Sequence, residues 1–259
     1  MLNISINFLI NNPLEQFEIN DFVYILAPLI GFTKLSLTNI GFYLILVIIL
    51  VLIINLFSNN NNKIIANRWS IGTESIYGSI VNIVRDQIGP VNEIYVPLIF
   101  TLFYFILLNN LVGMIPYSFT PTSHLVLTLS LSLTIFIAVT IIGFQQHGLK
   151  YFAYFVPAGT PLPLVPIIVL FEFISYLARA ISLGLRLGAN IIAGHVLLKI
   201  ISTFTWQIII AGPILLLISI IPLLFLTALA ALELGVAILQ AYVFTVLTCS
   251  YLKDAIYLH

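Results

Sequence analysis

The chain has 259 residues, of which 61% are hydrophobic and 7% charged, whereas soluble domains carry about 25% charged residues. Nine basic and nine acidic residues leave no net charge, which argues against a nucleic-acid partner. The single cysteine, Cys249, cannot form an internal disulfide. Because its apolar runs are long and uncharged, we expect an all-α integral membrane protein.

The N-terminal region, residues 1–35, is expected to be a leader followed by an interfacial segment. Residues 1–11 are short and uncharged, and no Arg-rich amphipathic transit sequence opens the chain. They are either a removable leader or an ordinary N-terminus. Glu15, Glu18 and Asp21 make the following stretch polar enough to face solvent or the membrane surface.

Three apolar runs are predicted to be conventional membrane spans. Residues 36–58 form an anchor helix whose stretch Ile40–Phe57 is almost purely aliphatic. Residues 94–144 form a pair of transmembrane helices, Ile94–Ile115 and Leu125–Phe144. All three runs are long enough to cross a hydrocarbon core.

Two kinds of polar residue occur within or beside these spans. Asn109 and Asn110 interrupt the first helix of the pair, and amides at this depth typically hold helices together. His124 lies at a span end and is interpreted as an interfacial histidine. Neither feature predicts chemistry.

Residues 63–93 are predicted to form an amphipathic surface helix. Apolar residues recur at helical spacing on one side, with Ser75, Ser79, Asn82 and Asp86 on the other. Two interpretations remain equally open: the helix lies on the membrane with its tryptophan at headgroup level, or it docks onto a soluble partner. The apolar residues are Trp69, Ile76, Ile80, Ile83 and Val84.

Residues 151–259 are predicted to contain a proline-rich loop and a long tilted antiparallel helical hairpin. Residues 157–166 hold four prolines in ten positions, which predicts a rigid, non-helical lead-in. Ile167–Gly212 lacks proline, and one continuous helix of that length would measure about 69 Å. Since the hydrocarbon core is about 30 Å thick, the segment either breaks at its glycines or lies steeply tilted. Pro213 then begins a second apolar stretch.

The stretch 172–195 combines high hydrophobicity with four ionisable residues, Glu172, Arg179, Arg186 and His195. A charge at membrane depth costs about 2.5 kcal/mol or more, so such residues usually mark an ion or proton pathway. On a helix, one narrow stripe collects Glu172, Ser175, Arg179, Ser182, Arg186 and Asn190, and the opposite face carries Gly184, Gly188, Ile191 and His195.

The two faces suggest different uses. Gly184 and Gly188 form a GxxxG pair that lets another helix approach closely. A structural ion pair of Glu172 with Arg179 is the alternative explanation for part of the polar stripe. It does not account for Arg186, which has no carboxylate within two turns and therefore suggests a partner in another chain.

Polar residues of the two long segments pair at one register if the segments form an antiparallel hairpin near Pro213. The residue numbers of each pair then add up to nearly the same value, which random placement would rarely produce. Two titratable groups therefore lie on either side of a fixed positive charge. The pairs are His195 with Glu233, Arg186 with Gln240, and Glu172 with Asp254.

The sequence resembles the a subunit of F-type ATP synthases, in particular the mitochondrially encoded fungal members known as subunit 6. The specific stretches are S-L-G-L-R-L-G-A-N at 182–190, the proline loop at 157–166 and the ending S-Y-L-K-D-A-I-Y-L-H at 250–259. The resemblance extends from about Pro13 to His259. It implies a stationary proton-translocating subunit with two offset half-channels at the interface with a rotating c ring.

The resemblance also assigns roles to particular residues. Arg186 corresponds to the essential arginine that faces the ring. His195 and Glu233 belong to the half-channel on the intermembrane-space side, and Glu172 and Asp254 to the one on the matrix side. Asn190 and Gln240 match polar residues near the arginine, whereas the roles of Arg179, His124 and His147 stay open.

The resemblance further implies partners and a location. The partners are the c ring, other membrane-sector and peripheral-stalk subunits, the lipid bilayer and a second synthase in a dimer. The location is the mitochondrial inner membrane, crossed several times. No catalytic residue, cofactor or metal is expected, and the sequence contains no Walker A loop, so the chain alone should not hydrolyse ATP. The alternative is a stand-alone ion-coupled secondary transporter or proton channel, but such transporters typically contain two similar halves, and no internal repeat is seen.

Overall fold

The computed structural model describes residues 14–27, 33–58, 67–115, 118–156 and 162–257, and these residues are predominantly helical. The expected all-α class is confirmed. The long helices are α2 (Asn39–Ser58), α3 (Arg68–Ile88), α4 (Val96–Gly113), α5 (Leu125–His147), α6 (Val165–Ala211) and α8 (Ile220–Ile256). The shorter elements are α7 (Pro213–Ile218), the strands β1 (Asp21–Ala27) and β2 (Thr33–Thr38), and the 3-10 helices η1 (Glu15–Phe17), η3 (Pro90–Tyr95), η4 (Pro121–Ser123), η5 (Gly148–Phe155) and η6 (Leu162–Leu164).

Several helical segments are long and apolar enough to cross a membrane, so the chain is a multi-pass membrane protein. They include the three predicted conventional spans and both arms of the predicted hairpin. The segments are Asn39–Ser58, Pro90–Gly113, Leu125–Phe155, Val165–Ala211 and Leu215–Ile256.

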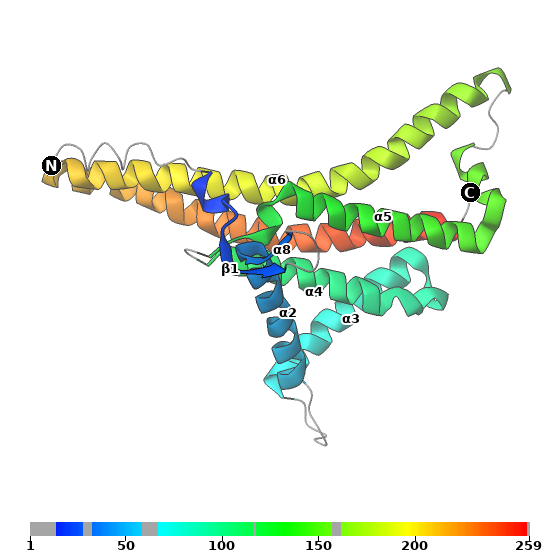
Figure 1. Ribbon diagram of the computed structural model, residues 1–259, viewed down its shortest axis with the longest axis horizontal. Helices are drawn as coiled ribbons and strands as arrows, with labels where there is room; N and C mark the ends of the chain where they lie inside the picture. The colour runs from blue at the N-terminus through cyan, green and yellow to red at the C-terminus, as the bar shows by residue number, and fades with distance from the viewer. Residues whose placement is uncertain (1–13, 28–32, 59–66, 116–117, 157–161, 258–259) are drawn as a thin grey trace.

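The long helices do not share one direction. α4, α5, α6 and α8 run side by side along the long axis of the molecule, and α2 stands across them (Figure 1). These helices therefore cannot all be perpendicular to one bilayer. If α2 is perpendicular to the bilayer, the four helices α4, α5, α6 and α8 are steeply inclined to the bilayer normal, as the length of the hairpin segments suggests.

Helix α6 is a single helix of 47 residues, so its glycines do not break it. It bends along its length, and its N-terminal part diverges from α8 (Figure 1). At its C-terminal end Gly212 has φ 155°, a conformation that residues with a side chain rarely adopt, and Pro213 starts α7. The predicted turn of the hairpin is therefore confirmed, with the short helix α7 inserted before α8.

The glycines of the GxxxG pair lie where α6 packs against α5. A Cβ atom on Gly184 would lie 2.5 Å from Ser132 Oγ and 2.8 Å from the carbonyl oxygen of Thr128. A Cβ atom on Gly188 would lie 2.9 Å from Thr128 Oγ1. This face of α6 is thus the packing face that the sequence predicts.

The Gly184→Ala variant should reduce the amount of assembled protein, because its methyl group meets a backbone carbonyl that cannot rotate away. Overpacking of this kind costs about 1–3 kcal/mol. The measurement is the folded fraction in native gels after stepwise heating. Gly41→Ala is the matched control, since no atom lies within 4 Å of a Cβ placed there. Equal heat resistance of the two variants would contradict the close packing of α5 and α6.

The prediction for the proline-rich loop is partly wrong. Residues 157–161 lie outside the described residues, but Leu162–Leu164 forms η6 and Pro166 lies in the first turn of α6. Proline fits there because the first N–H groups of a helix have no partner within the helix. The prolines therefore fix the start of α6 from inside the helix as well as before it.

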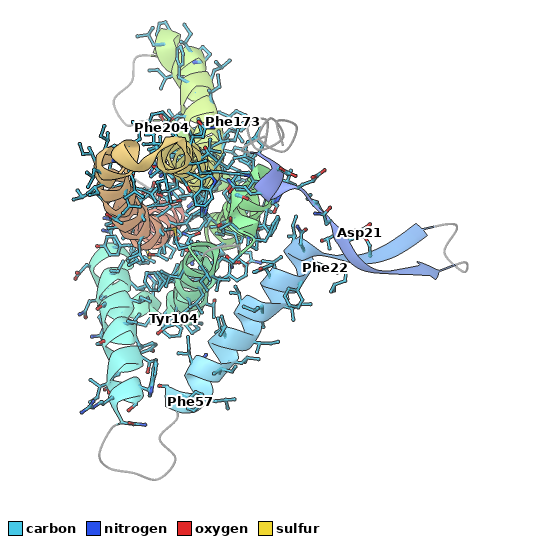
Figure 2. All side chains as sticks on the ribbon, turned by 90° about the vertical axis from the view of Figure 1, so that its left-hand side faces the viewer. Asp21, Phe22, Phe57, Tyr104, Phe173 and Phe204 are labelled. Carbon is cyan, nitrogen blue, oxygen red and sulfur yellow. The ribbon has the colours of Figure 1, made fainter. Side chains whose placement is uncertain are left out.

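The N-terminal region contains a β-hairpin that the sequence analysis did not predict; residues 1–13 lie outside the described part. β1 pairs with β2 in an antiparallel register, with Tyr24 opposite Ser36. The hairpin projects from the helices on the side where Asp21 and Phe22 lie (Figure 2). The alternation of polar and apolar residues in Thr33–Thr38 was the available signal.

Helix α3 has the predicted amphipathic pattern but begins at Arg68, after Asn67 accepts a hydrogen bond from the Arg68 N–H. Its buried residues Ile80, Val84 and Ile88 pack in one apolar cluster with residues of α4 and the end of α8. Much of the apolar face is therefore covered by this chain itself, which neither earlier interpretation anticipated. Trp69 at the other end remains 64% exposed.

Candidate functional site

His195 and Glu233 meet between the two arms of the hairpin. His195 on α6 places Nδ1 3.5 Å from Oε1 of Glu233 on α8, which confirms the contact expected from the antiparallel register. The side chain of His195 is 15% exposed and that of Glu233 only 5%. An imidazole and a carboxylate at this distance form a pair that can share or pass a proton.

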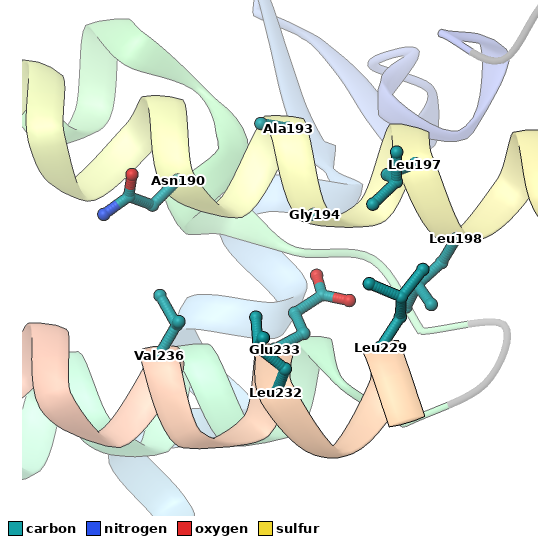
Figure 3. Close-up of a pocket in the computed structure, with 9 residues that line it drawn as sticks. All are labelled: Asn190, Ala193, Gly194, Leu197, Leu198, Leu229, Leu232, Glu233 and Val236. Atoms are coloured by element: carbon teal, nitrogen blue, oxygen red, sulfur yellow. The ribbon is translucent and has the colours of Figure 1, made fainter. Parts of the chain in front are cut away.

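Gly194 provides the space for this pair. Glu233 rises from α8 toward Gly194 on α6 (Figure 3). A Cβ atom on Gly194 would lie only 2.6 Å from Oε1 and 2.7 Å from Cδ of Glu233. A larger residue at this position would displace the carboxylate, so the absence of a side chain on Gly194 decides where the carboxylate lies.

The pair lies between two cavities. Glu233 lines a cavity of about 400 Å³, together with Asn190, Gly194 and mainly apolar residues (Figure 3). His195 lines a second, more polar cavity of about 830 Å³ that extends to the N-terminal segment. Leu198 borders both cavities. The imidazole and the carboxylate are therefore the titratable groups at the boundary between them.

Polar atoms of the pair lack hydrogen-bond partners in the described part of the chain. Neither carboxylate oxygen of Glu233 accepts a hydrogen bond there, and Nε2 of His195 makes none. The 3.5 Å separation is within ion-pair range but too long for a well-formed hydrogen bond. Buried polar groups without partners are costly, so such groups usually serve a function or contact water.

The middle of the hairpin differs from the predicted pairing. Gln240 accepts a hydrogen bond from Asn190 Nδ2 at 3.2 Å. Its bonded partner on α6 therefore lies one helical turn from Arg186, the partner that the sequence predicted. Arg186 is exposed and makes no hydrogen bond or ion pair to the described residues. Arg186 therefore presents its charge outward, away from the buried Leu183 and Leu187 of its own helix.

A second polar cluster surrounds Arg179, toward the N-terminal end of α6. Its Nη1 lies 3.3 Å from Asp254 Oδ2 and donates to the Tyr154 hydroxyl at 3.1 Å, and its Nη2 lies 3.9 Å from Glu172 Oε1. Glu172 and Asp254 are thus brought together through Arg179 rather than by direct contact. The side chains are about one-third exposed, so this cluster is more open than the His195–Glu233 pair.

Sequence reasoning left the role of Arg179 open and did not single out the tyrosines. Tyr154 also lies 3.4 Å from Asp254 Oδ2, and Tyr151 and Tyr176 share a hydrogen bond of 2.9 Å. Tyr176 stands three positions before Arg179, so helical spacing was the available signal. The second cluster is therefore an ion pair network with hydroxyl groups around it.

Asn110 connects α4 to α8 near the site. Its Nδ2 donates to the carbonyl oxygen of Ala237 at 3.2 Å, which confirms for Asn110 the expectation that amides of this span hold helices together, whereas Asn109 donates to Phe105 of its own helix. Ala237 lies on α8 between Glu233 and Gln240. The contact thus fixes the part of α8 that carries both polar residues.

Two further histidines of the described residues lie apart from this line of residues. His124 stacks on Phe119 with ring centroids 5.4 Å apart, and burial lowers the pKa of its imidazole. His147 places Nε2 2.9 Å from the carbonyl oxygen of Ile256, near the end of α8. Within the described ranges, no group of three or more His, Cys, Asp or Glu side chains could hold a metal ion.

Comparison with known proteins gives consistent results. Residues 40–253 match the family described as ATP synthase A chain. The chain is 55% identical over 250 residues to the ATP synthase subunit a of Podospora anserina, which covers 96% of this chain and 95% of the relative. It is 55% identical to that of Neurospora crassa, with 99% and 97% covered, and 47% identical to that of Saccharomyces cerevisiae, with 98% of each covered.

Proposed function

Because the chain belongs to the ATP synthase A chain family, we propose that it is the stationary proton-translocating subunit of the membrane sector. Proton uptake uses His195 and Glu233, and proton release uses Glu172 and Asp254. Arg186 separates the two routes at the surface that meets the rotating c ring. The chain is not an enzyme on its own, and ATP is made by other subunits.

The observation that carries this proposal is the His195–Glu233 pair. It is nearly buried, lacks hydrogen-bond partners and stands at the boundary between two cavities. A structural pair would gain stability from hydrogen bonds to its remaining polar atoms. A pair that passes protons needs both a titratable donor and space beside it, and this pair has both.

The proton route follows the polar residues of the hairpin. A proton reaches His195 from the larger cavity, passes to Glu233 and continues toward the Asn190–Gln240 pair. There it neutralises a carboxylate of the ring, which can then face lipid at low cost because it carries no charge. A potential of 100 mV supplies about 2.3 kcal/mol for each proton that crosses.

Release occurs at the other cluster. Arg179 holds Asp254 and Glu172 on opposite sides of its guanidinium, and their partial exposure lets a proton leave to water. The uptake and release groups are separated along α6, since His195 and Arg179 are about 24 Å apart at 1.5 Å per residue. A direct proton path between them would pass Arg186, whose guanidinium stays charged and repels it.

Partners and location follow from the family. The proposed partners are the c ring, the remaining membrane-sector and peripheral-stalk subunits, and a second synthase in a dimer. Exposed leucine and isoleucine side chains on α2, such as Ile48 and Leu52, are suited to lipid. The fungal relatives support a mitochondrial inner-membrane location.

Crosslinking from the Arg186 stripe tests the ring contact. In a Cys249→Ser background, a photoactivatable maleimide on Ser182→Cys, one turn from Arg186, should yield adducts with a small helical-hairpin subunit. Ile48→Cys is the control, since it is also exposed and lies on α2, whose main helix contacts are with α3 and α4 rather than with α6 or α8. Adducts identified by mass spectrometry decide the matter. A chain that purifies alone, or that crosslinks to the ring only from position 48, contradicts the proposal and favours a stand-alone transporter.

A further inference from the structure

We propose that the N-terminal segment, residues 15–20, forms the outer mouth of the proton uptake route, with Glu15 and Glu18 as carboxylates that collect protons for His195. This inference rests on the proposed function and extends it to a segment whose expected role was only to lie at the membrane surface. The ligand is the hydrated proton. The site is a water-accessible cavity with an acidic rim.

The cavity itself joins the segment to the hairpin. Glu15, Glu18 and Asn20 line it on the side of the N-terminal segment, and His195 and Ser202 line it on the side of α6. Its volume of about 830 Å³ is enough for roughly 25 water molecules at about 30 Å³ each. Water can therefore connect the carboxylates to the imidazole without a further protein group.

The segment is fixed in place rather than lying loosely over the opening. Asn39, the first residue of α2, donates from Nδ2 to the carbonyl oxygen of Glu18 at 2.9 Å. Its backbone N–H donates to the carbonyl oxygen of Asn20 at 3.0 Å. These two bonds tie both ends of a short turn to α2, so the carboxylates keep their position at the rim.

The inner end of the cavity leads to a group that requires a proton donor. The ring of Phe17 meets His195 edge-on, with centroids 6.3 Å apart, and so covers part of the imidazole. Behind His195 lies Glu233, which is 5% exposed and has no hydrogen-bond partner on either oxygen in the described residues. The order from rim to interior is thus exposed carboxylate, open cavity, imidazole and buried carboxylate.

The charges that line the cavity favour cations at its mouth. Its titratable groups come from three elements and the residue after the first of them: Glu15 in η1, Glu18 after it, Tyr43 in α2, and His195 and Lys199 in α6. The two carboxylates outnumber the one ammonium, so the formal charge of the lining is negative. Clefts lined with one sign of charge raise the local concentration of the opposite ion, and salt weakens this effect.

The test uses whole synthase in proteoliposomes, with pH and salt varied on the side to which the cavity opens. The Glu15→Gln/Glu18→Gln variant should synthesise ATP about threefold more slowly than wild type at pH 8 and low salt, and at nearly the wild-type rate at pH 6, where protons are abundant. High salt should lower the wild-type rate toward that of the variant. Glu74→Gln, an exposed carboxylate on α3 outside the cavity, is the matched control and should not change the rate.

A second measurement needs no change of charge. In the Cys249→Ser background, Ser202→Cys places a thiol in the cavity, and Thr203→Cys places one on the next, equally exposed residue outside it. A membrane-impermeant thiol reagent should slow proton flux through the first variant and leave the second unchanged.

Two results would each disprove the proposed mouth. One is equal proton flux through the two cysteine variants after labelling, and the other is equal pH and salt profiles for wild type and the double glutamine variant. If Glu233→Gln is also fully active, the proposed function fails as well; if only Glu233→Gln is impaired, the mouth alone is wrong.

Discussion

Replacing Arg186 with alanine should abolish ATP synthesis and ATP-driven proton pumping while the complex still assembles. The guanidinium is exposed on α6 and has no ion pair partner within the described residues, so its partner is expected on the ring. Removing one member of a desolvated charge pair costs about 3–5 kcal/mol. Since 1.4 kcal/mol is a factor of ten, the coupled rate should fall by at least about two orders of magnitude.

Lysine should not restore the rate, because an ammonium lacks the planar fork of the guanidinium and can lose its proton when desolvated. Arg85→Ala is the matched control: Arg85 is exposed on α3, pairs with Glu93 at 2.7 Å and lies outside the proton route. Ion pairs between exposed groups contribute little, so this variant should synthesise ATP normally. The measurement is ATP synthesis per assembled complex in membrane vesicles. Normal synthesis by Arg186→Ala would disprove the role of this arginine.

The second large effect concerns the His195–Glu233 pair. Glu233→Gln should lower proton flux by one to two orders of magnitude, because an amide keeps the shape of the carboxylate but cannot exchange a proton, and each tenfold loss equals about 1.4 kcal/mol. The amount of assembled complex should stay close to wild type, since neither oxygen of Glu233 holds another described residue by a hydrogen bond.

Exchanging the two residues gives the sharper result. His195→Glu combined with Glu233→His keeps one acid and one imidazole in contact, so the double variant should carry more flux than either single variant. In a double-mutant cycle the coupling energy should be about 1–3 kcal/mol. Proton flux and assembled complex are measured in all four proteins. If the losses simply add and follow the amount of complex, the two side chains pack the helices and do not share a proton.

The contact between His195 and Glu233 was predictable because an antiparallel hairpin fixes which residues face each other. The same reasoning predicted that Gln240 pairs with Arg186, whereas the side chain of Gln240 accepts a hydrogen bond from Asn190. Equal number sums assume two straight helices at a constant register, whereas α6 bends, and a bend depends on packing against other helices rather than on local sequence. The register was therefore reliable near the turn and less so farther from it.

Other features were not predictable from local patterns. The β-hairpin at Asp21–Thr38 depends on strand pairing, for which propensity is a weak guide. The central position of Arg179 between Glu172 and Asp254 requires the approach of α8, and only its ion pair with Glu172 followed from helical spacing. The packing glycines Gly184 and Gly188 were found because close helix contact restricts residue size in a recognisable way.

Because α6 is unbroken, the number of residues between two of its side chains fixes both their distance and their relative orientation. Each inserted residue would rotate everything beyond it by about 100° and move it by about 1.5 Å. A single insertion between Arg179 and His195 would turn the guanidinium stripe and the histidine to different neighbours, although every side chain would still be present. A substitution in this segment changes the contacts of one side chain, whereas a change in its length shifts every contact beyond it. In this part of the molecule it is the count of residues, as much as their identity, that has to be preserved.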